Sequence, residues 1–478
     1  MAKKIISLLL AAILICSLVG CGNRKKREIV QLTLSTEDSE KILNAAGIYL
    51  PEVEEVECRD TIIKLYGYRN DLQNYSDSEM VQTGYWTFKE RYGCDIEWIE
   101  CVFGERWNTL ANLILAGDSP DFYAAWATDF PIYSIKGMFQ PVDDYVDYDD
   151  PLWSGMKYMA DNYFSINGKH YVFVTDVIAN CVVVYNRRIM DEWGFEDPAE
   201  LFRNNEWTWD KMMDMSKTFT DPEDGRYAFN AWHTEEALFT STGTFLVEYD
   251  PEAGEYKSNL DDPRIERAAD WLYELMKNEL HFPSWTIGWA MNYGAEGGGM
   301  KEGKTLFAMG PWYIFDERRS AEEYDQIFGD IRGGELMIVP VPRDPNGDGE
   351  YYIDSKIKGY NLILGAPNPE AVGLLAACDR FKTVDPTVVN IDRVQLKEKK
   401  GWTEEMLEMW DTMYEIVNSH NTLVMFENGL GDAAPVVDTL FNYTRMGSDS
   451  SWGKRKEDNA DKLQYYLDDL NKQIREME

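Results

Sequence analysis

Flat aromatic side chains in predicted loops are the groups in this sequence with the clearest chemical use. A sugar presents apolar C–H faces edged by hydroxyl groups, so aromatic platforms beside planar polar side chains can bind it. Because the chain has sixteen tryptophans, most of them must pack in the core. The candidate platforms are those in loops after predicted strands: Trp126, Trp232, Trp285, Trp289 and Trp312.

One acidic side chain accompanies these rings. Asp129 and Trp126 follow a predicted strand at residues 121–125. Ligands of open α/β sheets bind beyond the carboxyl ends of the strands, so both side chains are candidate contacts. Trp285 and Trp289 share a short loop flanked by breakers, which favours a lid or a second platform.

Two motifs indicate other ligands, and their context argues against one of them. Residues 298–305 (Gly-Gly-Met-Lys-Glu-Gly-Lys-Thr) fit a phosphate-binding loop, but they lead into a predicted strand instead of opening a helix. Residues 344–349 match the start of a calcium loop, with Asp344, Asn346 and Asp348 as ligands. The twelfth position is Ser355 instead of Glu, and a tight turn explains the pattern equally well. Calcium stays an alternative, and no other cofactor is predicted.

The first residues predict export and a lipid anchor. Lys3 and Lys4 precede an apolar run at 5–15, which suits a signal peptide and is too short to span a membrane. Residues 18–21 (Leu-Val-Gly-Cys) resemble a bacterial lipobox, which predicts a signal peptide at 1–20 and lipidation of Cys21. We expect residues 21–60 to form a tether and the protein to lie on the outer face of a bacterial, Gram-positive cytoplasmic membrane.

Charge and cysteine content restrict the partners further. The formal charge of −37 argues against nucleic acid as a partner of the general surface. Processing and lipidation leave five cysteines without a C-x-x-C pair, which excludes a disulfide framework or a zinc signature. Cys94 and Cys101 could pair, although buried free thiols are the favoured interpretation.

Alternating strands and helices predict an α/β fold with parallel strands, and 478 residues suffice for two domains. β-branched runs and apolar alternation indicate strands at 61–68, 94–101, 121–125, 169–175, 181–185, 304–309 and 335–341. Helical spacing and capping residues indicate helices at 105–116, from 208, at 370–381 and at 459–477.

An ordered set of segments resembles the family 1 extracellular solute-binding proteins, the maltose-binding-protein type. The set covers about residues 60–385 and consists of 61–67, 116–121 (Ala-Gly-Asp-Ser-Pro-Asp), 168–171, 184–186, 207–210 (Trp-Thr-Trp-Asp), 302–312 and 359–371. The resemblance implies a two-lobed, periplasmic-binding-protein-like α/β fold of type II, hinged by crossing strands around an interlobe cleft. Residues 386–426, a largely helical stretch, depart from the simplest family pattern.

Carrying over the family's strand crossings implies hinges near 174–177, 310–313 and 355–359. One lobe would then hold 61–174 with 313–355, and the other 175–312 with 356–478. Trp312 would lie at a hinge, Tyr360 and Asn361 would follow the third crossing, and Glu427 could reach the cleft.

The resemblance implies a monomeric, non-catalytic binder that captures a carbohydrate, most simply an oligosaccharide, and delivers it to an ABC transporter permease. A secreted glycoside hydrolase and a membrane-anchored sensor or adhesin with the same fold are the alternatives. A hydrolase needs two carboxylates across the scissile bond, and 84 acidic residues always offer some pair. Peptide, polyamine and polyol ligands also stay open.

Overall fold

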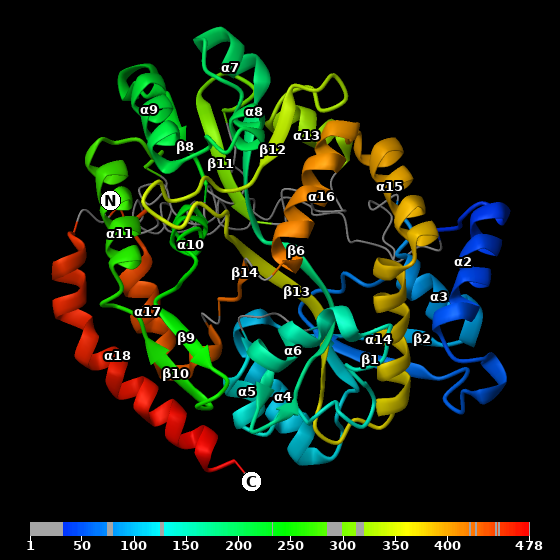
Figure 1. Cartoon of the computed structure of the whole chain (residues 1–478). Helices are drawn as coiled ribbons and strands as arrows, with labels where there is room; N and C mark the ends of the chain where they lie inside the picture. The colour runs from blue at the N-terminus through cyan, green and yellow to red at the C-terminus, as the bar shows by residue number, and fades with distance from the viewer. Residues whose placement is uncertain are drawn as a thin grey trace, which may run out of the picture.

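Two β-sheets, each covered by helices, form the frame of the molecule (Figure 1). The computed structural model describes residues 32–73, 80–124, 129–231, 233–283, 299–311, 320–419, 422–425, 428–444, 447 and 450–477. In these parts of the chain, no helix is both long and apolar enough to cross a membrane.

The first sheet has the strand order β14-β13-β3-β1-β2, with β6 paired to β13. Strand β1 runs parallel to β2 and β3, whereas β13 runs antiparallel to β3 and β6. Its strands are β1 (Ile62–Gly67), β2 (Asp95–Glu100), β3 (Phe122–Ala124), β6 (Phe173–Ala179), β13 (Ile353–Leu362) and β14 (Thr422–Leu423). The first lobe, built on this sheet, also contains β4 (Ser165–Ile166), β5 (Lys169–His170), α2 (Thr36–Tyr49), α3 (Thr83–Tyr92), α4 (Arg106–Ala116), α5 (Ile132–Ile135), α6 (Lys157–Tyr163), α14 (Pro369–Val384) and α15 (Pro386–Lys400).

The second sheet has the order β12-β7-β11-β8. Its strands are β7 (Cys181–Asn186), β8 (Tyr227–Phe229), β11 (Thr305–Pro311) and β12 (Leu336–Val339). The second lobe, built on this sheet, contains α7 (Arg187–Trp193), α8 (Pro198–Arg203), α9 (Trp209–Phe219), α10 (Thr234–Thr240), the hairpin β9 (Val247–Asp250) and β10 (Glu255–Ser258), α11 (Pro263–Lys277), α13 (Ala321–Ile327), η8 (Asn428–Ala433), α17 (Ala434–Phe441) and α18 (Trp452–Arg475). Its central strand β7 is buried along its whole length, which suits its run of valines.

The chain passes between the lobes at Asn180, where β6 of the first sheet is followed by β7 of the second. The predicted lobe boundaries need correction. Strand β12 pairs with β7, so the segment 313–355 stays largely with the second lobe. The second half of β13 pairs with β3, so this part of β13, with α14 and α15 after it, lies in the first lobe, whereas η8, α17 and α18 lie in the second. Local sequence patterns could not predict these pairings, because each segment contains an ordinary apolar strand that could pair in either sheet.

Part of the predicted tether is folded. Helix α2 begins at the cap Ser35, whose hydroxyl accepts a hydrogen bond from the amide of Asp38, 3.0 Å away. Its buried face, with Ile42, Ala45 and Ala46, packs in the first lobe against α3 and α15. The polar composition that suggested a tether therefore belongs to the solvent face of an amphipathic helix.

The helical stretch at 386–426 links both lobes. Helix α15 packs on α2 and α14 of the first lobe, and α16 (Glu404–Asn418) packs on β6, β12 and β13. At the start of α16, Glu405 accepts hydrogen bonds from Arg187 at 2.6 and 2.7 Å and from Arg203 at 2.8 Å. Near its end, the hydroxyl of Tyr414 donates to Asp176 of β6 at 3.0 Å.

The two cysteines that could have paired lie at opposite ends of one strand. Cys94 precedes β2 and Cys101 follows it, and both are free thiols. Six residues of extended chain lie between them, so their Cα atoms are roughly 20 Å apart. A disulfide needs Cα atoms within about 7 Å, so this pairing is excluded.

Candidate functional site

A buried ion pair lies in the first lobe where β3 leads toward the second lobe. We call Arg106, Tyr123 and Asp129 the Asp129 cluster. Asp129 accepts hydrogen bonds from the Arg106 guanidinium and from the Tyr123 hydroxyl, each at 3.3 Å. The carbonyl oxygen of Arg106 is held at 2.7 Å by the hydroxyl of Tyr66 on β1. The predicted candidate Asp129 is therefore part of a built polar cluster beyond the carboxyl ends of the strands.

Burial sets the chemistry of this carboxyl group. Asp129 is 3% exposed, and its removal from water raises its pKa to about 6. The charge and hydrogen bond of Arg106, with the bond from Tyr123, oppose that rise. The cluster therefore offers a carboxyl group and a guanidinium that are fixed in place.

Two aromatic rings beside the cluster form what we call the aromatic rim, Tyr68 and Phe103. Phe103 is 51% exposed, and its ring centre lies 4.7 Å from that of Tyr68 in an edge-to-face arrangement. The Arg106 guanidinium lies 4.0 Å from the Phe103 ring centre. An exposed ring next to fixed hydrogen-bonding groups can receive a solute with both apolar and polar faces.

Sequence reasoning missed both residues of the rim. Tyr68 directly follows β1, and Phe103 comes soon after the end of β2. Their positions after two parallel strands are the signal that could have found them, and it is the same signal that indicates Trp126 and Asp129.

A second polar cluster lies at the chain crossing. We call Asn180, Cys181, His233, Glu236 and Asp354 the crossing cluster. The Asn180 side-chain amide donates to Asp354 Oδ2, and the Cys181 sulfur lies 3.6 Å from the same oxygen. In α10 and its cap, His233 Nδ1 lies 3.4 Å from Glu236 Oε1. The cluster joins the first turn of α10 to both crossing strands.

Asp354 has a strongly perturbed acidity. Its side chain is 2% exposed, and burial raises its pKa to about 7. The nearby charge of Glu236 raises the pKa further, while bonds from Asn180 and Cys181 and the charge of His233 lower it. Its Oδ1 atom has no hydrogen-bond partner in the described part of the chain.

Two other predicted contacts have structural partners. Tyr360 is 1% exposed, and its hydroxyl donates to Asp379 of α14. Asn361 is 3% exposed, and its amide donates to the carbonyl oxygen of Tyr171 at 3.0 Å. Both residues belong to β13, and these bonds hold their side chains inside the first lobe.

The remaining predicted residues lie outside the described residues. They are Cys21, Trp126, Trp232, Trp285, Trp289, Trp312 and Glu427. They stay predictions from the sequence.

The calcium-type turn has partners of its own. Asp344 accepts two hydrogen bonds from Arg267, at 2.8 and 2.6 Å, and one from the amide of Asn346. Asp348 accepts from the Tyr352 hydroxyl at 2.7 Å. Within the described ranges, no three His, Cys, Asp or Glu side chains come together in a way that could hold a metal.

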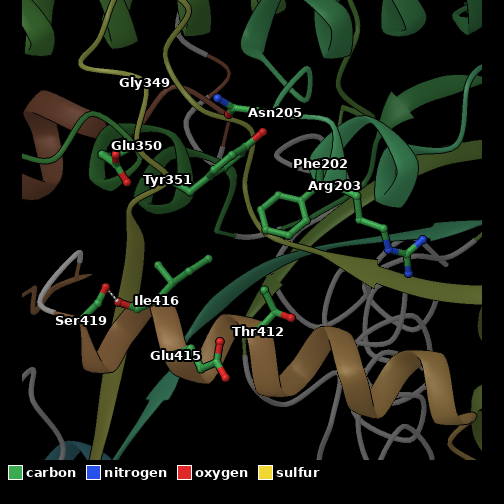
Figure 2. Close-up of a pocket in the computed structure, with 10 residues that line it drawn as sticks. All are labelled: Phe202, Arg203, Asn205, Gly349, Glu350, Tyr351, Thr412, Glu415, Ile416 and Ser419. Atoms are coloured by element: carbon green, nitrogen blue, oxygen red, sulfur yellow. Dashed lines mark hydrogen bonds between the residues drawn. The ribbon is translucent and has the colours of Figure 1, made fainter.

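A cavity of about 490 Å³ lies away from these clusters, between α8, the loop before β13 and α16 (Figure 2). Phe202 and Tyr351 face it with their rings 4.7 Å apart, and Thr412 and Glu415 line the opposite wall on α16. Its walls come from the second lobe and α16, and none of its lining residues is in the Asp129 cluster, the aromatic rim or the crossing cluster.

Comparison with known proteins gives one family and one fold. The sequence pattern of the bacterial extracellular solute-binding proteins matches residues 86–373. No curated protein sequence matches the chain.

Solved structures with low sequence identity share the architecture. An ABC substrate-binding protein from Listeria monocytogenes in complex with cycloalternan is 15% identical, with 87% of this chain and 99% of that chain covered and a TM-score of 0.57. The GacH receptor of Streptomyces glaucescens, solved unliganded and with acarbose, is 14% identical over 86% and 99% of the chains, with a TM-score of 0.60. A binding protein of B. animalis subsp. lactis in complex with β-1,6-galactobiose is 16% identical over 86% and 98%, with a TM-score of 0.56. At these identities the similarity shows the fold alone, and it confirms the predicted two-lobed α/β architecture.

Proposed function

The chain belongs to the family of bacterial extracellular solute-binding proteins, and we propose that it captures a carbohydrate between its lobes for an ABC transporter. The family places the protein outside the cytoplasm, and it supports a binding protein over the alternative of a glycoside hydrolase. The finer parts of the proposal are the ligand class, the transporter as partner and the lipid anchor.

The observation that carries the ligand class is the aromatic rim beside the Asp129 cluster. Phe103 offers an exposed apolar face, and Arg106 and Asp129 offer hydrogen-bonding groups held in position by burial. This pairing matches a sugar, whose ring has apolar C–H faces and hydroxyl edges. The carbohydrates bound by cycloalternan-, acarbose- and galactobiose-binding proteins of the same fold support an oligosaccharide.

We infer that the second lobe forms the wall of the site that faces Phe103 and the Asp129 cluster. His233, 27% exposed at the start of α10, is the described polar side chain nearest to Trp232 in sequence. The tryptophans predicted from the sequence would add platforms on either side of the sugar. Delivery to a permease would then depend on closure of the lobes around the ligand.

A thermal-shift screen tests the function. The protein is heated with a panel of oligosaccharides, with peptides and polyamines as controls. A ligand at one hundred times its Kd adds about 2.7 kcal/mol of stability, enough to raise the melting temperature measurably. A shift with one sugar class and no release of reducing sugar supports the proposal. A sugar that is consumed, or shifts with the controls only, would contradict it.

Phe103→Ala tests the position of the site. We expect the Kd for a sugar found in the screen to rise about 10- to 30-fold, because a central aromatic contact contributes about 1.4–2 kcal/mol. Leu115→Ala, at an 85% exposed residue at the end of α4, is the matched control and should leave the Kd unchanged. Isothermal titration calorimetry measures both, and equal affinities of the two variants would place the sugar elsewhere.

We further propose that Cys21 carries the lipid anchor. Two acyl chains bind a membrane stably, whereas one binds it only marginally. Cys21→Ser should therefore move the protein from the membrane fraction to the medium, as measured by fractionation and immunoblotting. Retention of the variant in the membrane fraction would mean that another element anchors the protein.

A further inference from the structure

The main chains of the two lobes approach each other closely between Gly429 and Phe130. A Cβ atom built on Gly429 would overlap the carbonyl oxygen and carbon of Phe130 and lie 3.1 Å from its nitrogen. All three atoms belong to the main chain, so no side chain can rotate away to make room. A residue larger than glycine therefore cannot occupy position 429 while this contact exists.

Phe130 is fixed in the first lobe. Its side chain is 3% exposed, and its ring packs against Phe164 with the ring centres 5.4 Å apart. It directly follows Asp129, which Arg106 and Tyr123 hold in the cluster. The contact with Gly429 is therefore made one residue away from the proposed binding groups.

Gly429 is fixed in the second lobe. Segment η8, which contains it, packs on α17 and α18. Just beyond α17, the backbone amides of Tyr443 and Thr444 donate to Glu235 Oε1 at 3.0 and 2.6 Å. Glu235 lies on α10, which packs on β7 and β11 of the second sheet.

The three atoms nearest to a Cβ at position 429 all belong to the first lobe. Gly429 does not have the left-handed φ that favours glycine, in contrast to Gly431 at φ 59°. An alanine could therefore adopt the backbone conformation of residue 429 if Phe130 were farther away.

Two further contacts join the lobes, one through α18 and one through β9. The Asn167 side-chain amide of the first lobe donates to the carbonyl oxygen of Ile474, at the end of α18, at 3.1 Å. Helix α6 of the first lobe also lies against β9 of the second. Separation of the lobes would break these contacts together with the one at Gly429.

We propose that Gly429 determines how closely the two lobes approach, and thereby how tightly a solute is retained. Because glycine has no side chain, the main chains of the two lobes can approach each other beside Asp129. The lobes are therefore in contact at this position. The part of the inference that concerns retention rests on the proposed function, whereas the part that concerns lobe approach does not.

The test compares Gly429→Ala with Gly453→Ala, in the first turn of α18, where an added Cβ meets nothing within 4 Å. Small-angle X-ray scattering is recorded without ligand and with the sugar that the wild type binds most tightly in the screen. In at least one of these conditions, the wild type and Gly453→Ala should be more compact than Gly429→Ala. The Kd for the sugar should rise at least tenfold in Gly429→Ala only.

Thermal unfolding completes the test. Gly429→Ala should still unfold in one cooperative transition without ligand, because the substitution acts on the contact between the lobes and not on the core of either lobe. Scattering identical to that of the wild type in both conditions would overturn the inference, and so would loss of the folded state. Failure of the carbohydrate proposal would be seen separately, as a wild type that responds to no sugar, and the ligand-free comparison of the variants would still stand.

Discussion

Arg106→Met is expected to lower the free energy of unfolding by about 3–5 kcal/mol at pH 8, because it leaves a buried charge without its partner. Asp129 is 3% exposed, and the Arg106 guanidinium lies 3.3 Å from its carboxylate. Urea unfolding at pH 8 and pH 5 measures the effect. The loss should be clearly smaller at pH 5.

The pH dependence follows from the acidity of Asp129. Its pKa in the folded protein is about 6, and Arg106 is one of the groups that hold it down. Without Arg106 the pKa lies higher, so at pH 5 the carboxyl group takes up a proton and the buried charge disappears. The double variant Arg106→Met/Asp129→Asn should recover most of the lost stability at pH 8. Equal losses at both pH values, or no recovery in the double variant, would show that Arg106 acts only by packing.

Asp354→Asn is expected to raise the free energy of unfolding at alkaline pH, whereas Arg106→Met lowers it. Burial raises the pKa of Asp354 to about 7, from an ordinary value of 3.8. The folded state therefore binds this proton more tightly than the unfolded state, and the resulting stability is lost as the pH rises from about 4 through 7. The free energy of unfolding falls by at most about 4 kcal/mol over this pH range. The variant does not show this fall, because an amide does not ionise.

The groups around Asp354 determine at which pH values the variant and the wild type should be compared. The charged or titratable groups that face Asp354 are Glu236, His233 and Cys181, and Asn180 donates to it. The free energy of unfolding of Asp354→Asn should exceed that of the wild type at pH 8 and match it near pH 4.5. Asp118→Asn, at an exposed position after α4, should show no such difference. A variant less stable than the wild type at pH 8 would mean that the carboxylate is needed in its charged form.

Local sequence signals predicted the elements well. Thr208 was expected to cap a helix, and its hydroxyl does accept a hydrogen bond from the amide of Lys211 at the start of α9. The strand predicted at 94–101 is β2, and the helix predicted at 459–477 is α18, which buries Leu463, Leu467, Leu470 and Ile474 and leaves the predicted apolar Tyr466 only partly buried. Such signals are local, because each depends on the repeat of a single strand or helix.

The assignment of segments to lobes could not be predicted in the same way. Whether β12 pairs with β7 or with a strand of the first sheet depends on contacts between segments about 150 residues apart. Tyr360, expected near the ligand, instead donates to Asp379 of α14 inside the first lobe, and local patterns do not show which way its strand faces. For the site, Asp129 stays a prediction that rests on its position after a strand. Its pairing with Arg106 required the three-dimensional structure.

The proposed capture of a carbohydrate beside Phe103 is tested by a crystal structure with the sugar that gives the largest thermal shift. We expect an intact sugar between the lobes, with one ring against Phe103 and its hydroxyl groups within hydrogen-bonding distance of Arg106 or Asp129. A sugar bound only in the cavity between Phe202, Tyr351 and α16 would contradict it, and so would a cleaved sugar at the interlobe boundary.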